Sequence, residues 1–259
     1  MDNNDIVFSL PALSLRPYIT HYWLSRNNHD SHCPILPDGT IDVVFNIRMS
    51  GSINRVYGAV THRIDYPLDL GSRYLGINFK PGQSRHFLTA AANEFTDYYE
   101  AAEETMALSF NGVEETLCGG NIFRKLDVLL ESHLQQKPPS TSPIDRLIKA
   151  LEVHKGQLSL AECAHLYGKS IRQLQRDFIQ AVGISVKLYA QIIRFHFASK
   201  ELLKGHHNLA GLAASLGYTD QSHMNRDFRR FTELSPLAFS ASDAAFIQDR
   251  YFRFLDNRF

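Results

Sequence analysis

Leu174-Gln175-Arg176-Asp177-Phe178 is followed, fifty positions later, by the similar Met224-Asn225-Arg226-Asp227-Phe228. Two further blocks repeat in nearly the same register, one before each stretch and one after it. They are Leu160, Ala161, Ala164 and Gly168 with Leu209, Ala210, Ala213 and Gly217, and Ser185 and Tyr189 with Ser235 and Phe239. A period of about fifty residues with short helical segments predicts two copies of one helical unit. Small residues on the first helix, a glycine at its end and a polar residue opening the next helix indicate helix-turn-helix units.

The second helix of each unit should have one buried face and one face of hydrogen-bonding side chains. Ser170 and Asp220 are suitable N-caps, and apolar residues four apart predict the buried face. The opposite faces carry Arg172, Gln173, Gln175 and Arg176 in the first unit and Gln221, Ser222, Asn225 and Arg226 in the second. Arg matches the guanine edge and Gln or Asn the adenine edge in a DNA major groove. Solvated faces of an all-helical domain are the alternative, which the tandem repeat makes less favourable.

The second unit, from Gly217 through Tyr218-Thr219-Asp220-Gln221-Ser222-His223 to Phe231 and on to Leu234-Ser235-Pro236, closely resembles the signature of AraC/XylS-type transcription regulators. Residues 160–189 resemble that family's first helix-turn-helix, so the likeness spans roughly 144–240. It implies a linker helix at about 186–204 and two recognition helices in successive major grooves of double-stranded DNA. The base-reading positions that it implies are Arg172, Gln175, Arg176, Gln221, Ser222, Asn225 and Arg226. Val186 and Thr232-Glu233 depart from the frequent Pro and Gly, which puts only local turns in doubt.

Charge divides the chain in the same way. Residues 144–240 hold 13 Lys and Arg against 8 Asp and Glu, a net charge of +5, whereas residues 1–143 hold 11 against 16, a net charge of −5. A basic domain suits phosphate binding and an acidic one does not. Candidate phosphate contacts are Arg194, Lys200, Arg229 and Arg230.

The prolines at 138, 139 and 143 mark the domain boundary. We expect a sensor or dimerisation domain at 1–136, a linker at 137–143, a DNA-binding domain at 144–240 and a C-terminal tail at 241–259. Ser142 should cap a helix running to about His154. An acidic N-terminus and no long apolar run favour a cytoplasmic protein without membrane contact. The scattered Cys33, Cys118 and Cys163 suggest neither disulfides nor a zinc site.

The first half predicts strands at 18–25, 41–47, 55–59 and 74–79, then a helical pattern from about Ser84, which makes the fold class α+β. Residues 36–45 and 75–82 resemble, less specifically, a sensor-like domain that precedes the DNA-binding part of some AraC-type proteins. The family resemblance implies that the amphipathic helix at 121–136 is a dimer contact. On that interpretation, Leu126→Glu with Leu130→Glu should weaken self-association. Packing on its own sheet is the alternative.

A small-molecule effector is a further expectation, with Tyr18, Tyr22, Trp23 and Tyr57 as candidate pocket residues, although aromatic side chains of a β domain commonly form its core. RNA polymerase is an expected partner, and no cofactor is expected. His21, His29, His32 and Cys33, with Asp38 and Asp42, fit no metal-site spacing. The Asp38-Gly39 pair is instead expected to form a turn before the strand at 41–47. An N-terminal enzyme or metal-dependent sensor is the principal alternative, and a protein-binding helical module is another.

Overall fold

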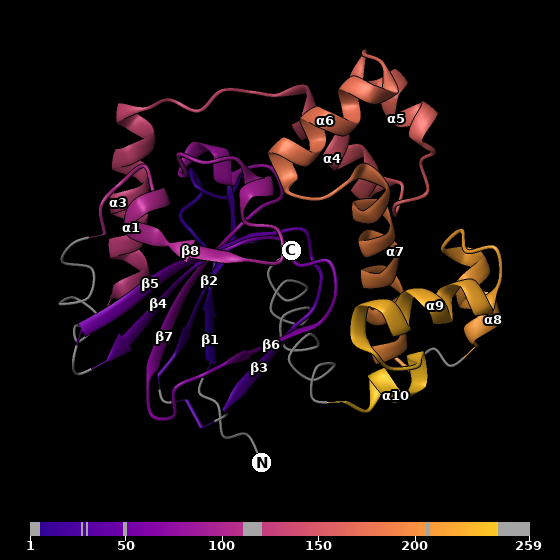
Figure 1. The fold of residues 1–259 in the computed structure, drawn as a ribbon, viewed down its shortest axis with the longest axis horizontal. Helices are drawn as coiled ribbons and strands as arrows, with labels where there is room; N and C mark the ends of the chain where they lie inside the picture. Colours follow the sequence, from indigo (N-terminus) through magenta and orange to yellow (C-terminus); the bar gives the residue numbers. More distant parts are fainter. Residues whose placement is uncertain are drawn as a thin grey trace.

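Six strands of the described chain form one antiparallel sheet in the order β1-β2-β7-β4-β5-β8 (Figure 1). The structure is a computed structural model that describes residues 6–26, 28–29, 31–48, 51–110, 121–205 and 208–242. Along the sheet the strands are β1 (Ile6–Ser9), β2 (Ile19–Ser25), β7 (Arg73–Phe79), β4 (Ile41–Arg48), β5 (Gly51–Tyr57) and β8 (Tyr99–Ala101). Strands β3 (His32–Ile35) and β6 (Ile64–Pro67) pair separately. Together with the helical second half, this confirms the α+β class.

The four predicted strands correspond to β2, β4, β5 and β7, which are the inner strands of the sheet. The helical pattern expected from Ser84 was largely wrong. That region holds the 3-10 turns η1 (Ser84–His86) and η2 (Ala92–Glu94), then β8 and the short α1 (Ala102–Thr105). Apolar residues of this region, such as Phe87 and Phe95, are buried in the core of the sheet domain, although they lie at the ends of short 3-10 turns. Their burial therefore produced an apolar pattern without a long helix.

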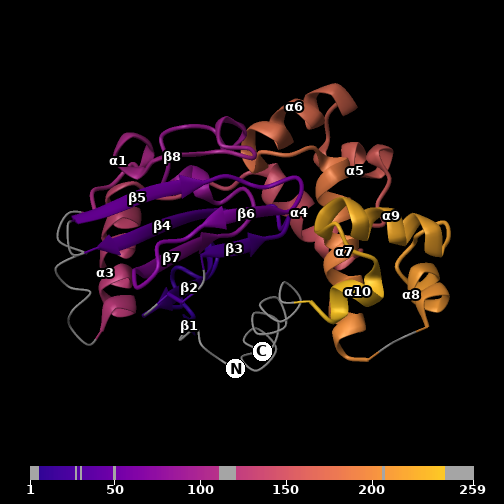
Figure 2. The ribbon, with the colours of Figure 1, turned by 60° about the horizontal axis from the view of Figure 1, so that its bottom comes forward.

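Helix α3 (Ile122–Gln136) lies along the sheet (Figures 1 and 2). Leu126 and Leu130 have no exposed surface and belong to the core of the N-terminal domain. Tyr22 of β2 stacks on Phe123 with ring centroids 6.0 Å apart. The prediction that Leu126 and Leu130 form a dimer contact was therefore wrong: their glutamate variants would place charges in a core instead. The amphipathic pattern was right, but its partner is the domain's own sheet.

The C-terminal domain is built of helices around a single apolar core. They are α4 (Pro143–Val153), α5 (Leu160–Tyr167), α6 (Ile171–Val182), α7 (Val186–Leu203), α8 (Leu209–Ser215), α9 (Gln221–Thr232) and α10 (Pro236–Ser240). Ser142, Ser170 and Asp220 cap α4, α6 and α9 as expected, because each side-chain oxygen accepts a hydrogen bond from a backbone N–H of the first turn. The expected tail lies outside the described residues from 243 onward, as does Cys118. No helix in the described ranges is both long and apolar enough to span a membrane.

The face of the sheet opposite α3 carries a polar row across three strands. His21, Asn78 and Asp42 are registered neighbours on β2, β7 and β4. The Asn78 amide donates to Asp42 Oδ2 at 2.9 Å and to Thr40 Oγ1 at 2.8 Å. The two stretches that resemble a sensor-like domain thus meet side by side, and their polar residues bind one another.

Asp42→Asn is expected to remove a pH-dependent loss of stability from this domain. Burial, with a further contribution from Asp38, raises the pKa of the Asp42 carboxyl from 3.8 to about 7. The pKa is raised only in the folded state. The contribution of protonated Asp42 to the free energy of unfolding is therefore complete below pH 3.8 and is lost as pH rises through about 7. Relative to the parent, the variant should gain up to about 1.4 kcal/mol per pH unit across that window.

Trp23, the chain's only tryptophan, lies on the same face and reports unfolding of this domain selectively. Urea unfolding followed by its fluorescence, at about pH 5 and about pH 7.5, measures the difference. Parallel stability profiles of parent and variant across this range would show that Asp42 titrates normally.

Candidate nucleic-acid interface

Helix α6 presents the residues expected to read bases in the first unit. Arg172, Gln175 and Arg176 are exposed, while Leu174 and Phe178 have no exposed surface. This apolar face packs on the core of the domain. At the start of the helix, the Ser170 hydroxyl accepts a hydrogen bond from the Gln173 backbone N–H. The exposed side chains therefore project from a rigid support.

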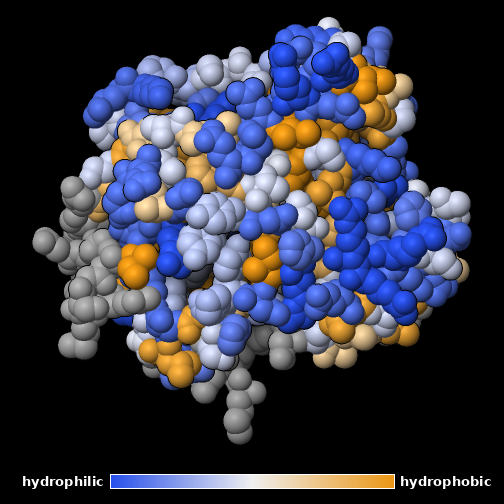
Figure 3. Space-filling model, viewed as in Figure 1, coloured by the Kyte–Doolittle hydropathy of each residue, from blue (hydrophilic) through white to orange (hydrophobic). Residues whose placement is uncertain are grey.

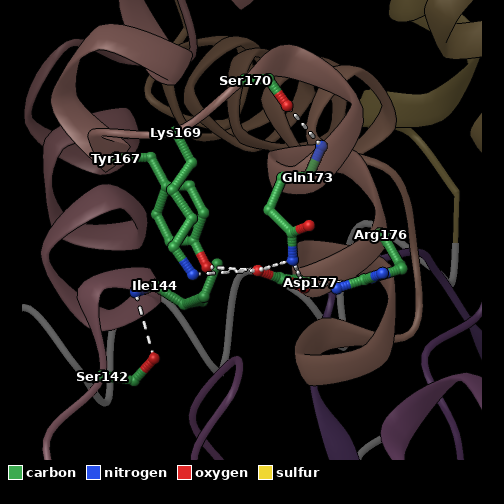
Figure 4. A network of polar contacts seen from close by, with 8 residues as sticks. All are labelled: Ser142, Ile144, Tyr167, Lys169, Ser170, Gln173, Arg176 and Asp177. Carbon is green, nitrogen blue, oxygen red and sulfur yellow. Dashed lines mark hydrogen bonds and ion pairs between the residues drawn. The ribbon is translucent and has the colours of Figure 1, made fainter.

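Figure 4 shows a polar network around Asp177 of α6. Tyr167 Oη donates to Asp177 Oδ2 at 2.7 Å, and Gln173 Nε2 donates to Oδ1 at 2.6 Å. Arg176 approaches Oδ1 through Nε at 3.4 Å, with 72% of its side chain exposed. The hydrogen bonds from Gln173, then Tyr167, hold the pKa of the Asp177 carboxyl below its ordinary value. Gln173, assigned to the outward face from sequence, is thus bound to Asp177, while Arg176 keeps further donors for a ligand.

Sequence reasoning missed two apolar residues on the outer surface of α6. Ile171 is 42% exposed and Ile179 is 37% exposed. Apolar side chains on a recognition helix can contact thymine methyl groups. Their positions next to Arg172 and four residues after Gln175 are the signal that would have placed them on this face.

Helix α9 presents the second set. Gln221, Ser222 and Arg226 are exposed and Asn225 is half-buried. Met224, Phe228 and Phe231 are fully buried beneath them. In the view of Figure 3, the surface over α8 and α9 is mostly hydrophilic.

The two departures from the family pattern are accommodated. Glu233, in the place of the frequent glycine, adopts left-handed backbone with φ of +64° and still ends α9. Val186 is the first residue of α7 behind the cap Ser185, and its side chain is buried. Both turns therefore form, although a non-glycine residue at positive φ carries some strain.

The four candidate phosphate contacts lie in different surroundings. Arg194 stacks over Tyr218 at 5.2 Å and approaches the Gly217 carbonyl, and Lys200 is half-buried on α7. Arg229 and Arg230 are exposed near the end of α9, with Arg230 also 3.5 Å from Gln191 Oε1. The pair on α9 is thus the more accessible.

The four candidate effector-pocket aromatics make separate contacts. Tyr18 packs edge-on against His86, and Tyr22 lies under α3, where it donates to Asp127 Oδ1 at 2.9 Å. Trp23 lies over Gly76 on the opposite face, and Tyr57 packs against Tyr66 and Tyr99 at the other end of the sheet. The structure does not bring the four rings around one space.

The histidines near the N-terminus are also spread out. His21 is buried on β2, where burial lowers its pKa to about 3, whereas His29 and His32 are exposed. Cys33 is half-buried on β3. Within the ranges that the structure describes, no three His, Cys, Asp or Glu side chains gather to hold a metal ion.

Comparison with known proteins gives two family matches. Residues 8–100 match a family described as a domain of unknown function, and residues 163–242 match a family described as a helix-turn-helix domain. None of the curated proteins matches the chain.

Solved structures are similar at low identity. ToxT from Vibrio cholerae is 8% identical with a TM-score of 0.48, over 85% of this chain and 98% of that chain. ToxT bound to an unsaturated fatty acid is 10% identical with a TM-score of 0.42, over 93% and 97%. The transcriptional regulator CdpR from Pseudomonas aeruginosa is 19% identical with a TM-score of 0.35, over 68% and 47%.

The helix-turn-helix match covers α6 through α10, and the repeated units within it have the caps, buried faces and exposed polar faces described above. The chain thus contains a helix-turn-helix domain and is a DNA-binding transcription regulator, whose repeated units are similar to those of the AraC type.

Proposed function

We propose that α6 and α9 enter successive major grooves of one operator and read its bases directly. The supporting observation is that both helices are capped, firmly packed and lined outward by exposed side chains with paired donors and acceptors. The reading residues are Arg172, Gln175, Arg176, Gln221, Ser222, Asn225 and Arg226. Phosphate contacts from Arg229 and Arg230, with Arg194 and Lys200 as further candidates, fix the register of the protein on the duplex.

We further propose that the N-terminal domain modulates this activity, through a small-molecule effector or through dimerisation, and that RNA polymerase is a partner. Contacts between the domains support modulation, because they give a change in one domain a direct route to the other: Arg85 forms an ion pair with Asp145 of α4, and Thr96 donates a hydrogen bond to the Gly183 carbonyl at the end of α6. For a dimer, the contact must lie outside the buried face of α3. Equilibrium sedimentation of the full chain tests for it.

A fragment of residues 140–259 is expected to fold alone and bind DNA at low salt. Leu147, Ile148 and Leu151 of α4 complete its core, and the domain's net charge favours phosphate contact. Binding should weaken steeply as salt rises, because phosphate neutralisation releases counterions. A DNA shift assay with unrelated competitor, repeated over a salt series, measures both effects.

The same assay separates DNA reading from a purely protein-binding role. An unfolded fragment would contradict the domain boundary. A folded fragment that ignores salt, or that binds no DNA, would contradict the proposed function.

A further inference from the structure

Helix α7 joins the two helix-turn-helix units and contacts both. It packs against α4 and α6 on one side of the domain and against α8, α9 and α10 on the other, and Figure 1 shows it between the two units. Buried residues run along it from Val186 to Leu202. Its placement therefore determines how far apart α6 and α9 lie and how they are turned relative to each other.

The Pro37–Gly39 turn of the N-terminal domain contacts this helix. Pro37 O accepts a hydrogen bond from His196 Nε2 at 2.8 Å, so this nitrogen carries the ring proton. Gly39, with φ of +75°, approaches the Tyr189 ring so closely that a Cβ there would lie 2.7 Å from it. Tyr189 and His196 are seven residues apart, about two helical turns, and so share one face of α7.

Both sides of this contact are fixed. The Asp38 carboxylate accepts from Thr40 N at 2.9 Å and from Thr40 Oγ1 at 2.7 Å, which closes the turn. On α7, Tyr189 is 2% exposed and its hydroxyl donates to Glu152 of α4 at 3.2 Å. Neither the turn nor the ring can move far without breaking a hydrogen bond.

The same domain also holds the first unit directly. Arg85 forms an ion pair with Asp145 of α4 at 2.8 Å, and Thr96 Oγ1 donates to the Gly183 carbonyl at the end of α6 at 2.5 Å. The base-reading side chains of α6 and most of those of α9 remain exposed in this arrangement. The docked domain thus holds the reading module without covering it.

We propose that the Pro37–Gly39 turn is a positioning element for DNA reading: by holding α7 it fixes the separation and phase of α6 and α9. This proposal rests on the proposed function. It makes the N-terminal domain a determinant of the spacing between the two DNA half-sites that α6 and α9 read. A duplex accepts two reading helices only at spacings that match its repeat of about 10–10.5 base pairs. A loosened α7 should tolerate spacings that the native helix rejects.

The test uses the full-length protein and a DNA duplex that the parent protein selects by binding from a library of random sequences. From this duplex we would make a series with the two half-sites moved apart or together by one and two base pairs, and a duplex with one half-site. Gly39→Ala and His196→Leu should each reduce the preference for the native spacing about tenfold, because linked sites gain affinity only when the geometry allows both to bind. Binding to the single half-site should stay within about twofold of the parent.

Two controls make the result specific. Gly71→Ala introduces the same backbone strain at φ of +73° in the same domain, with nothing within 4 Å of the new Cβ, and should keep the native spacing preference. His196→Gln retains a donor for Pro37 O and should restore much of the preference lost in His196→Leu. If Gly39→Ala does not fold, the two His196 variants decide the outcome.

The proposal is overturned if folded Gly39→Ala or His196→Leu keeps the native preference, or if either binds every duplex more tightly, which would make the turn an inhibitory contact. A parent protein that binds the single half-site as well as the full duplex would instead refute the proposed two-groove reading.

Discussion

Phe195→Ala is expected to lower the stability of the helical domain by about 3–5 kcal/mol. Phe195 lies on α7 without exposed surface, and its ring meets those of Phe228, Phe231 and Phe239 at 4.9, 5.3 and 6.0 Å. Its removal leaves a cavity where α7, α9 and α10 converge, and rigid rings from three directions cannot collapse into it. Circular dichroism should show helix lost at lower temperature, and Trp23 fluorescence should show the sheet domain still folded.

Phe197→Ala is the matched control on the same helix. Phe197 is half-buried at the margin of the core, and Lys155 Nζ lies over its ring, 5.5 Å from the centroid. Its loss should cost only about 1 kcal/mol. Equal destabilisation by the two variants would mean that Phe195 is not the centre of this core.

Arg176→Ala and Arg226→Ala are each expected to weaken specific binding by about 1–3 kcal/mol. Both side chains are exposed on recognition helices, so the fold should survive their truncation. Each variant should also relax the preference for one base position, because a bidentate contact to a base edge is lost. Affinity measured against single-base variants of the selected duplex, with circular dichroism as a check of folding, gives both results.

Arg124→Ala removes the same charge from the exposed side of α3 and should leave operator affinity unchanged. Parental footprints for Arg176→Ala and Arg226→Ala would refute direct readout by these residues. Loss of helix in either variant would mean that its side chain supports the core.

The helical domain was predicted in detail because its signals are local. Helices α6 and α9 are each defined by residues that lie close together in the sequence. These are the caps Ser170 and Asp220 and, in each helix, apolar residues spaced four apart. The sheet domain was predicted less completely. Strands β1, β3, β6 and β8 have only three or four residues each, and β3 contains Pro34, so they lack a readable alternation.

Contacts between distant residues were outside the reach of sequence reasoning. The Asp38-Gly39 turn was predicted and is confirmed by the positive φ of Gly39 just before β4. Its contact with α7, however, joins residues 159 positions apart, as in the Pro37–His196 hydrogen bond. Periodicity likewise placed Leu126 and Leu130 on one apolar face but could not say what covers it.

Leu36 and Ala59 of the sheet domain pack into the same apolar cluster as the helices of the DNA-binding domain. A chimaera made by joining another regulator's sensor at the proline-rich linker would therefore lack the matching surface, and its recipient domain would expose apolar groups to water. Successful exchange would require transplanting the loops around Leu36 and Ala59 together with the helical surface that they pack against. The two domains of this chain are separate in sequence, but they are not interchangeable parts.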